Sequence, residues 1–244
     1  MKADLEDALV PVAWARAQIP VLQERFLSWQ RSYPYKLVCE PERGRPDREL
    51  LVAYLERPLD PLIIGDIGAI INSVRTGLDL MMAAVVARHG VAPETAPNFP
   101  IREKSSDFFK RVTQLKADKW ISADEATAIE RTKAYNGGDH VLWHIAKLDN
   151  LRKHQRLLFV EPLPTQLDLT GVPYAERLML HSHAQNRSSL YRIPAGSFRP
   201  TRGNTNLAAE IFLNETYSGV GMRPGLVAVR AYVDRVSALI GSFP

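Results

Sequence analysis

The sequence predicts an α+β fold in which a helical bundle around one long central helix packs beside a small, mostly antiparallel sheet. Residues 60–89 form one long apolar segment with helical periodicity, and residues 157–213 hold short β-prone runs separated by Pro, Gly and Asn. No Gly/Ser/Pro-rich tract interrupts the 244 residues as a linker would. We therefore expect one domain over residues 1–244.

Three consecutive parts make up this expected domain. Residues 1–58 form a helix and a β-hairpin, residues 59–156 form the helical bundle, and residues 157–244 form a β-rich part that ends in a helix. We find no internal repeat and no low-complexity segment.

In the first part, residues 5–30 have helical periodicity that Pro11 and Pro20 interrupt. We expect a broken helix whose second half begins near Pro20, with an apolar face that includes Val21, Leu22 and Phe26. After it, residues 35–40 and 50–55 are rich in β-formers and flank a turn-like segment, a pattern typical of a β-hairpin.

The central helix has clear start and stop signals. Asp60 can cap its N-terminus, Pro61 suits its first turn, and Gly90 can end it near His89. The pattern therefore predicts the longest element of the chain.

Further helices follow in the second part. Amphipathic periodicity predicts two short helices over residues 105–116 and 123–135, and Ser122 with Glu125 forms a capping box for the second. Gly137-Gly138 then breaks the chain, and Asp139 can cap a helix that reaches about residue 156.

The third part changes to short β-prone runs and then returns to a helix. Pro224 opens that last helix, over about residues 225–240, whose apolar positions share one face. The expected strands cover residues 157–160, 178–181, 189–193 and 207–213.

Composition bounds the class of protein. The formal charge is +4, but 31 basic residues are spread along the chain among 27 acidic ones, which permits nucleic-acid binding without indicating it. The single cysteine, Cys39, excludes an intramolecular disulfide and a cysteine-cluster metal site. Residues 1–9 lack the order of a secretory signal, so we expect a cytoplasmic protein.

The apolar run at residues 62–86 has the length of a membrane span. It contains Asp66, Arg75 and Asp79, and each charge at mid-bilayer costs about 2.5–3.5 kcal/mol on insertion scales. We therefore expect no membrane partner.

A polar stripe runs along the central helix beside its apolar face. Gly68, Asn72, Arg75 and Asp79 share this stripe, and apolar positions border it. Charges seldom lie in such a place unless they are paired, so we expect a partner for the stripe.

The helix at residues 140–156 offers that partner. Asp149 and Arg152 lie within or beside its core side, so we expect them to meet Arg75 and Asp79 across a helix–helix contact. The network either fixes helix register or forms a binding site, and its candidate residues are Asn72, Arg75, Asp79, Asp149, Asn150, Arg152, Lys153 and His154.

The order of these motifs resembles a group of uncharacterised bacterial and phage-associated proteins with an R-x3-D helix and a DN-x2-KH helix. This chain has Gly65-Asp66, then VRTGLD at residues 74–79, FPI at residues 99–101 and LDNLRKH at residues 148–154. The resemblance covers about residues 60–160.

Arg75 and position 80 also resemble, more distantly, the arginine–spacer–histidine pattern of HEPN-type helical domains, which include metal-independent RNases and defence toxins. The resemblance implies that the arginine neutralises charge at the phosphate while the histidine transfers a proton. Leu80 stands at the expected histidine position, so such a site is degenerate unless His154 supplies an imidazole. A guanidinium alone cannot do acid–base chemistry at neutral pH.

Other patterns point to metal or RNA. His140 and His144 have the i, i+4 spacing of two metal ligands, and His181 and His183 share one strand face, but neither pair has a clear third ligand. Two basic sets could track a phosphate backbone if both lie on one side of the molecule, and a solvated helix face is the alternative for the first. They are Lys147, Arg152, Lys153, His154 and Arg156 near Trp143, and Arg187, Arg192, Arg199 and Arg202.

The sequence therefore favours a non-catalytic binding or interaction protein without a cofactor. Its partner stays open between a second copy of the chain and RNA. The alternative is a HEPN-like RNase or nucleic-acid-binding defence factor with a degenerate site, whose catalytic candidates are Arg75 and His154.

Overall fold

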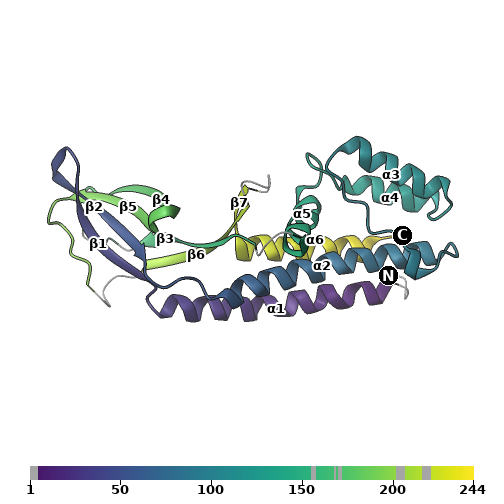
Figure 1. Cartoon of the computed structure of the whole chain (residues 1–244), viewed down its shortest axis with the longest axis horizontal. Coiled ribbons are helices and arrows are strands. Elements are labelled where there is room, and N and C mark those ends of the chain that lie inside the picture. The colour runs from purple at the N-terminus through teal and green to yellow at the C-terminus, as the bar shows by residue number, and fades with distance from the viewer. Residues whose placement is uncertain (1–4, 155–157, 168, 170–171, 202–206, 216–220) are drawn as a thin grey trace. The chain divides into compact units, whose positions relative to one another are not determined.

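The structure is a computed structural model, and residues 5–154, 158–167, 169, 172–201, 207–215 and 221–244 are described. These residues confirm the α+β class, with six α-helices and two small antiparallel sheets (Figure 1). In chain order the elements are α1 (Glu6–Arg31), β1 (Tyr35–Glu42), β2 (Arg45–Leu55), α2 (Pro61–Ala87), α3 (Ser105–Ala117), α4 (Ala123–Thr132), α5 (His140–His154), β3 (Val160–Leu167), β4 (Glu176–Ser182), β5 (Arg187–Pro194), β6 (Leu207–Glu215), β7 (Gly221–Pro224) and α6 (Gly225–Ser242).

The chain divides into two compact units. The helical unit comprises Met1–Gln23, Ile64–Phe159 and Leu213–Pro244, and the sheet unit comprises Glu24–Ile63 and Val160–Phe212. The units interleave along the chain, so they do not coincide with the three consecutive parts expected from the sequence. The expectation of a single cooperative domain stays a prediction.

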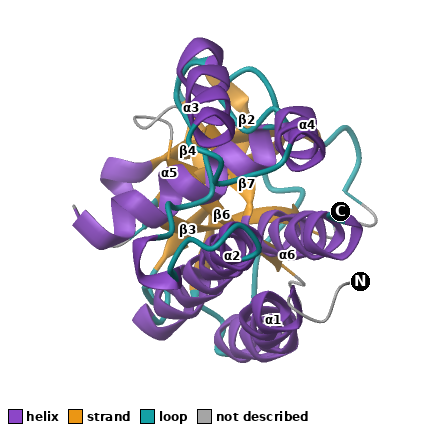
Figure 2. Ribbon diagram, turned by 90° about the vertical axis from the view of Figure 1, so that its right-hand side faces the viewer, coloured by secondary structure: helices purple, strands orange, loops and turns teal. Residues whose placement is uncertain are grey.

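The helical unit is built on α1, α2 and α6, which run side by side (Figures 1 and 2). The apolar face that borders the polar stripe of α2 is fully buried. Its members are Ile63, Ile67, Ile70, Val74, Leu78, Met81 and Val85. Gly77 lets α1 approach closely, since a Cβ there would lie 2.5 Å from Val12 Cγ2 and 2.9 Å from the carbonyl oxygen of Ala8.

Among the described helices, only α2 is long and apolar enough to cross a membrane by length and composition. Of its most apolar 18-residue window, 56% is buried within the protein. A core helix passes the same test of composition.

The expectation of a broken N-terminal helix is wrong, because α1 continues from Glu6 to Arg31 with Pro11 and Pro20 inside it. The buried positions follow each other at alternating spacings of three and four residues, which keeps one seam against the core. They are Leu5, Ala8, Val12, Ala15, Ile19, Leu22, Phe26 and Trp29. Val21, which we placed on the apolar face, is 47% exposed.

The expected helix starts are confirmed. The Asp60 carboxylate accepts the amide of Leu62 at 2.9 Å, Ser122 and Glu125 form a capping box, and the Asp139 carboxylate accepts the amides of the first turn of α5. The helix expected over residues 123–135 ends earlier, at Thr132, because Lys133 adopts a left-handed conformation with φ of 49°. Gly138 is required here, since a Cβ would lie 2.2 Å from the Lys133 carbonyl oxygen.

The sheet unit contains the predicted β-hairpin, β1–β2, with Gly44 at φ of 77° in its turn. The hairpin is part of a larger antiparallel sheet with strand order β1-β2-β5-β4, whereas the sequence suggested that the later strands form a sheet of their own. The second sheet has the order β3-β6-β7. A small apolar core lies on the first sheet and consists of Leu51, Ala53, Leu167, Leu190 and Ile193.

Candidate functional site

Two residues of the polar stripe of α2, Arg75 and Asp79, bind the backbone of Phe99, and we call this arrangement the clasp. Arg75 Nη2 lies 2.9 Å from Asp79 Oδ1 and donates to the Phe99 carbonyl oxygen at 3.2 Å. In return, the Phe99 amide donates to Asp79 Oδ1 at 2.9 Å. Phe99 itself is 1% exposed, so the ion pair fixes the loop between α2 and α3 against the core.

Burial dominates the electrostatics of this clasp. Desolvation raises the pKa of Asp79, and the nearby Arg75 and the Phe99 amide lower it only in part. The Arg75 side chain is nearly sealed, and its Nη1 atom is buried with no hydrogen-bond partner in the described part of the chain. Arg75 is therefore nearly closed to solvent, while the Asp79 side chain keeps 27% of its surface exposed.

A second cluster centres on Asp149 of α5, which is 2% exposed. Asn72 on α2 donates to its Oδ1 at 3.1 Å, and Arg152 Nη2 lies 3.4 Å from the same atom. Lys153 Nζ lies 2.6 Å from Oδ2. This carboxylate accordingly carries the contact between α2 and α5, with Gly68 leaving room for the Arg152 side chain, since a Cβ there would lie 2.8 Å from Arg152 Cδ.

The expected network is thus present in a different arrangement. Asn72 meets Asp149, but Arg75 and Asp79 pair with each other and with Phe99. Asn150 and His154 lie exposed on α5. The predicted network did not include the Phe99 backbone, because backbone groups of a loop leave no pattern of side chains.

The histidine pair of α5 lies at the edge of the helical core. The rings of His140 and His144 are 5.7 Å apart, and His144 is 3% exposed. Burial, Arg223 and His140 together lower the pKa of His144 to about 4. Its Nδ1 atom and the Tyr232 hydroxyl are buried without a hydrogen-bond partner in the described residues.

No group of three metal-ligating side chains forms anywhere in the described part of the chain. The imidazole of His181 lies 2.8 Å from the Ser188 hydroxyl, and the side chain of His183 lies outside the described residues. Among the described side chains, His140 and His144 have no third ligand to complete a metal site.

The basic sets are largely neutralised by acidic neighbours. Arg187 pairs with Glu40 at 2.7 Å, and Arg192 pairs with Glu42 at 2.7 Å. Arg199 pairs with Glu49 at 3.1 Å, while Arg202 and Arg156 lie outside the described residues. On α5, Lys147 Nζ stands 5.9 Å from the ring centroid of Trp143.

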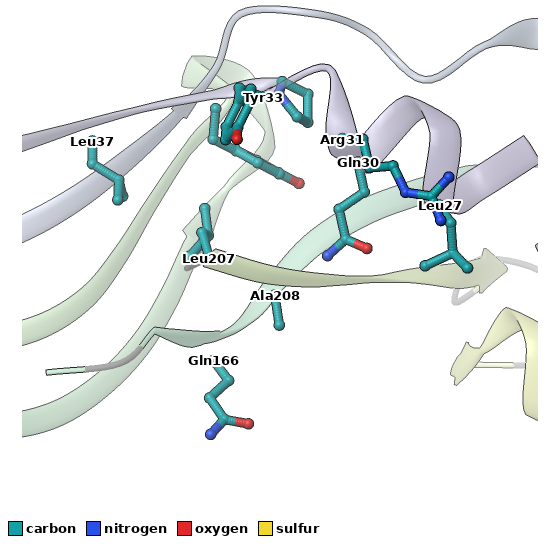
Figure 3. A pocket seen from close by; sticks show the side chains of 10 residues that line it. Leu27, Gln30, Arg31, Tyr33, Leu37, Gln166, Leu207 and Ala208 are labelled. Atoms are coloured by element: carbon teal, nitrogen blue, oxygen red, sulfur yellow. The ribbon is translucent and has the colours of Figure 1, made fainter. Parts of the chain in front are cut away.

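A pocket of about 520 Å³ lies in the sheet unit, and sequence patterns gave no sign of it (Figure 3). It lies where the last turns of α1 meet β1, β3 and β6. Its lining combines apolar, amide and aromatic side chains. The residues are Leu27, Gln30, Arg31, Tyr33, Pro34, Tyr35, Leu37, Gln166, Leu207 and Ala208.

Some polar groups of this pocket already form hydrogen bonds or ion pairs within the chain, and others do not. The Tyr35 hydroxyl donates to the Pro162 carbonyl at 2.8 Å, and Arg31 pairs with Glu24 at 2.8 Å. Within the described residues, the side-chain amides of Gln30 and Gln166 have no hydrogen-bond partner. Tyr33 is 62% exposed and has φ of 52°, an uncommon conformation for an aromatic residue.

Comparisons of the chain with family models, with curated proteins and with solved structures gave no match.

Proposed function

We propose that the chain is a non-catalytic binding protein whose small-molecule ligand occupies the pocket of the sheet unit. The pocket itself is the observation that carries this proposal, since an apolar wall with a few uncommitted polar groups is the usual form of a ligand site. About 520 Å³ is also within the size range of such sites.

The lining favours an amphipathic ligand. Leu27, Leu37 and Leu207 offer an apolar wall to a flat or aliphatic body. The amides of Gln30 and Gln166 can each donate and accept, so they suit a polar group such as a carbonyl or an amide. Arg31 also lines the pocket, but its guanidinium already pairs with Glu24 at 2.8 Å.

The state of the polar stripe supports a role without catalysis. Arg75 and Asp79 are engaged with Phe99, and Asp149 with three donors, so these groups are committed to packing contacts. A catalytic group needs access to a substrate, which the Asp149 carboxylate, 2% exposed, lacks.

A dye titration tests the pocket. The probe is 1-anilinonaphthalene-8-sulfonate, which has an apolar body and an anion, and its fluorescence is followed with the full chain. Ala208→Phe fills the pocket and should lower the affinity about tenfold or more. Ala209→Phe is the matched control, because neighbouring residues of a strand face opposite sides.

The dye also binds other apolar surface, so the readout is the difference between the two variants. If both variants lose dye affinity equally, or if Ala208→Phe loses none, the proposed pocket is contradicted. Circular dichroism of each variant shows that the fold is retained.

A HEPN-like nuclease or nucleic-acid-binding factor is the second proposal. It draws support from Lys153 and His154, two basic side chains exposed at the end of α5 beside the network. Cleavage of mixed RNA that is lost in both Arg75→Lys and His154→Ala would establish it. Failure to bind or cut such RNA at low salt would refute it.

A further inference from the structure

Strand β1 forms one edge of the four-stranded sheet in the sheet unit. The strand order is β1-β2-β5-β4, so β1 has β2 on one side, and among the described residues no strand pairs with its other side. An unpaired edge presents a row of backbone N–H and C=O groups to which another extended chain can bond. We call this side of β1, over residues 35–40, the open edge.

The register of the hairpin identifies the backbone groups on the open edge. The carbonyl of Pro34, just before β1, accepts the amide of Glu56, just after β2, at 2.9 Å. Bonded and non-bonded positions alternate along an antiparallel ladder. Every second residue after Pro34 therefore bonds to β2, whereas Tyr35, Leu37 and Cys39 direct their N–H and C=O groups to the open edge. These backbone groups have no hydrogen-bond partner in the described part of the chain.

The two edges of this sheet differ in regularity. At the far edge, β4 has a register shift between Arg177 and Leu180, and Met179 within it has φ of 54°. Such a bulge bends an edge strand and protects it from pairing with another chain. In contrast, β1 keeps one register from Tyr35 to Pro41, where the proline ends the row of outward N–H donors. The open edge therefore keeps the geometry that strand pairing needs.

The pocket of the sheet unit lies along this edge. Tyr35 and Leu37 line it, and their side chains pack with Cys39 against the small apolar core of the sheet. Leu27 and Leu207 extend the apolar lining (Figure 3). Directly opposite residues of paired antiparallel strands send their side chains to the same face. A strand added to β1 would thus place every second side chain on the pocket side.

We infer that the ligand of the pocket is a short extended peptide that adds to β1 as an antiparallel strand. This inference rests on the proposed function, because it names the ligand of the same pocket. Strand addition uses main-chain hydrogen bonds for affinity and side-chain pockets for specificity. The open edge supplies the hydrogen-bonding groups, and the pocket supplies the place for side chains.

A peptide fits this site better than the β1 edge of a second copy of the chain. Once a peptide pairs with β1 on one side, the N–H and C=O groups on its other side still need partners. Gln30 of α1 and Gln166 of β3 line the same pocket, and their side-chain amides have no partner in the described residues. The β1 strand of a second copy is already bonded to its own β2 on that side, so it would leave both amides unused.

Isothermal titration of the full chain with blocked heptapeptides tests this inference. The probes are Lys-Thr-X-Thr-X-Thr-Lys, in which both X residues are Leu, Val or Phe and so lie on one face of an extended chain. We expect at least one probe to bind with a Kd below about 1 mM. N-methylation of one X residue should weaken it at least about tenfold, because in an antiparallel strand that N–H faces β1. N-methylation of the central Thr should weaken it less than about threefold, and any other pattern overturns the inference.

Two variants at Cys39 test the open edge of the chain itself. Cys39→Pro removes an outward N–H without removing a bond to β2, and Cys39→Ala, which removes only the thiol, is the matched control. Cys39→Pro should weaken peptide binding at least about tenfold relative to Cys39→Ala. Equal peptide affinity of the two variants overturns the inference. The methylated peptides need no variant, so they decide the question if Cys39→Pro does not fold.

The dye titration separates this inference from the proposed function. Both Cys39 variants should bind 1-anilinonaphthalene-8-sulfonate equally, because position 39 is not among the described residues that line the pocket. Dye binding that Ala208→Phe weakens, without binding of any probe peptide at about 1 mM, would retain the pocket and overturn the peptide. Failure of the dye test as well would overturn both. A dimer in sedimentation equilibrium that Cys39→Pro dissociates would assign the open edge to a second copy and also overturn the inference.

Discussion

Arg75 carries more of the stability of the helical unit than its position on a polar stripe suggests. Within the described residues, Arg75 is the only guanidinium that pairs with Asp79. Its removal therefore leaves the Asp79 carboxylate without this partner and the Phe99 carbonyl without its donor. Arg75→Ala should therefore lower the free energy of unfolding by about 3–5 kcal/mol in urea titrations. Arg16→Ala removes an exposed pair of similar geometry, 53% and 54% exposed, and should cost at most about 1 kcal/mol. If both variants lowered the free energy of unfolding by a similar, small amount, the clasp would not be a buried ion pair.

His144 should make the protein sensitive to acid. An unfolded histidine titrates near pH 6.5, whereas burial, Arg223 and His140 lower the pKa of folded His144 to about 4. Between these values the unfolded chain binds a proton that the folded chain does not. Neutral His144 therefore contributes its full share of the free energy of unfolding above about pH 6.5. This share, about 3 kcal/mol, is lost as the pH falls to 4.

Urea titrations at several pH values measure this effect. His144→Phe should flatten the decline between pH 6.5 and 4 relative to the wild type. His154→Phe, at an exposed position of the same helix, is the matched control and should keep the wild-type decline. An unchanged slope in His144→Phe would show that other groups cause the acid sensitivity.

At the scale of single residues, periodicity located the polar stripe but not most of its partners. The spacing on α2 placed Arg75 and Asp79 beside apolar positions, which correctly indicated burial and pairing. The Phe99 backbone was missed, because a loop carbonyl and amide have no residue type that marks them. Lys153, a candidate without an assigned partner, proves to be the nearest cation to Asp149.

At the scale of elements, helix starts were easier to predict than helix continuity. Asp60, Ser122 and Asp139 act locally, and each caps the helix that follows it. Pro11 and Pro20 led to the wrong prediction of a broken helix. In an isolated helix each proline removes a hydrogen bond and costs about 3 kcal/mol. The long buried seam of α1 offsets that cost, and such tertiary packing is not visible in local propensity.

Two glycines of α2 provide a paired test of helix packing. Gly77→Ala places a methyl group 2.5 Å from Val12 and 2.9 Å from the Ala8 carbonyl, so it should destabilise the chain by about 1–3 kcal/mol. Gly65→Ala has nothing within 4 Å and should stabilise it by about 0.5–1 kcal/mol through helix propensity. Thermal unfolding should therefore shift in opposite directions. A gain in both variants would mean that α1 moves away from α2 without cost.

At the scale of the whole molecule, the order of the elements along the chain predicted the α+β class but not which segments form each compact unit. The sequence suggested consecutive parts, whereas each unit is assembled from segments far apart in the chain. The β1–β2 hairpin illustrates the reason. Its edge pairs with β5, more than 130 residues later, and strand pairing over that separation leaves no local pattern.

One cooperative unfolding transition is the expectation for this arrangement. The chain passes between the units four times, and α1, α2 and β6 each continue through a boundary without a break. Unfolding one unit therefore removes ordered turns from elements of the other, which couples the two transitions. Leu51→Ala in the sheet unit and Leu78→Ala in the helical unit each empty a fully buried position and should cost about 2–5 kcal/mol. Fluorescence and far-ultraviolet circular dichroism, followed in urea, should give coincident curves that both variants shift together. Two separate transitions, each moved by one variant alone, would show that the units are independent domains and that the single-domain prediction is wrong.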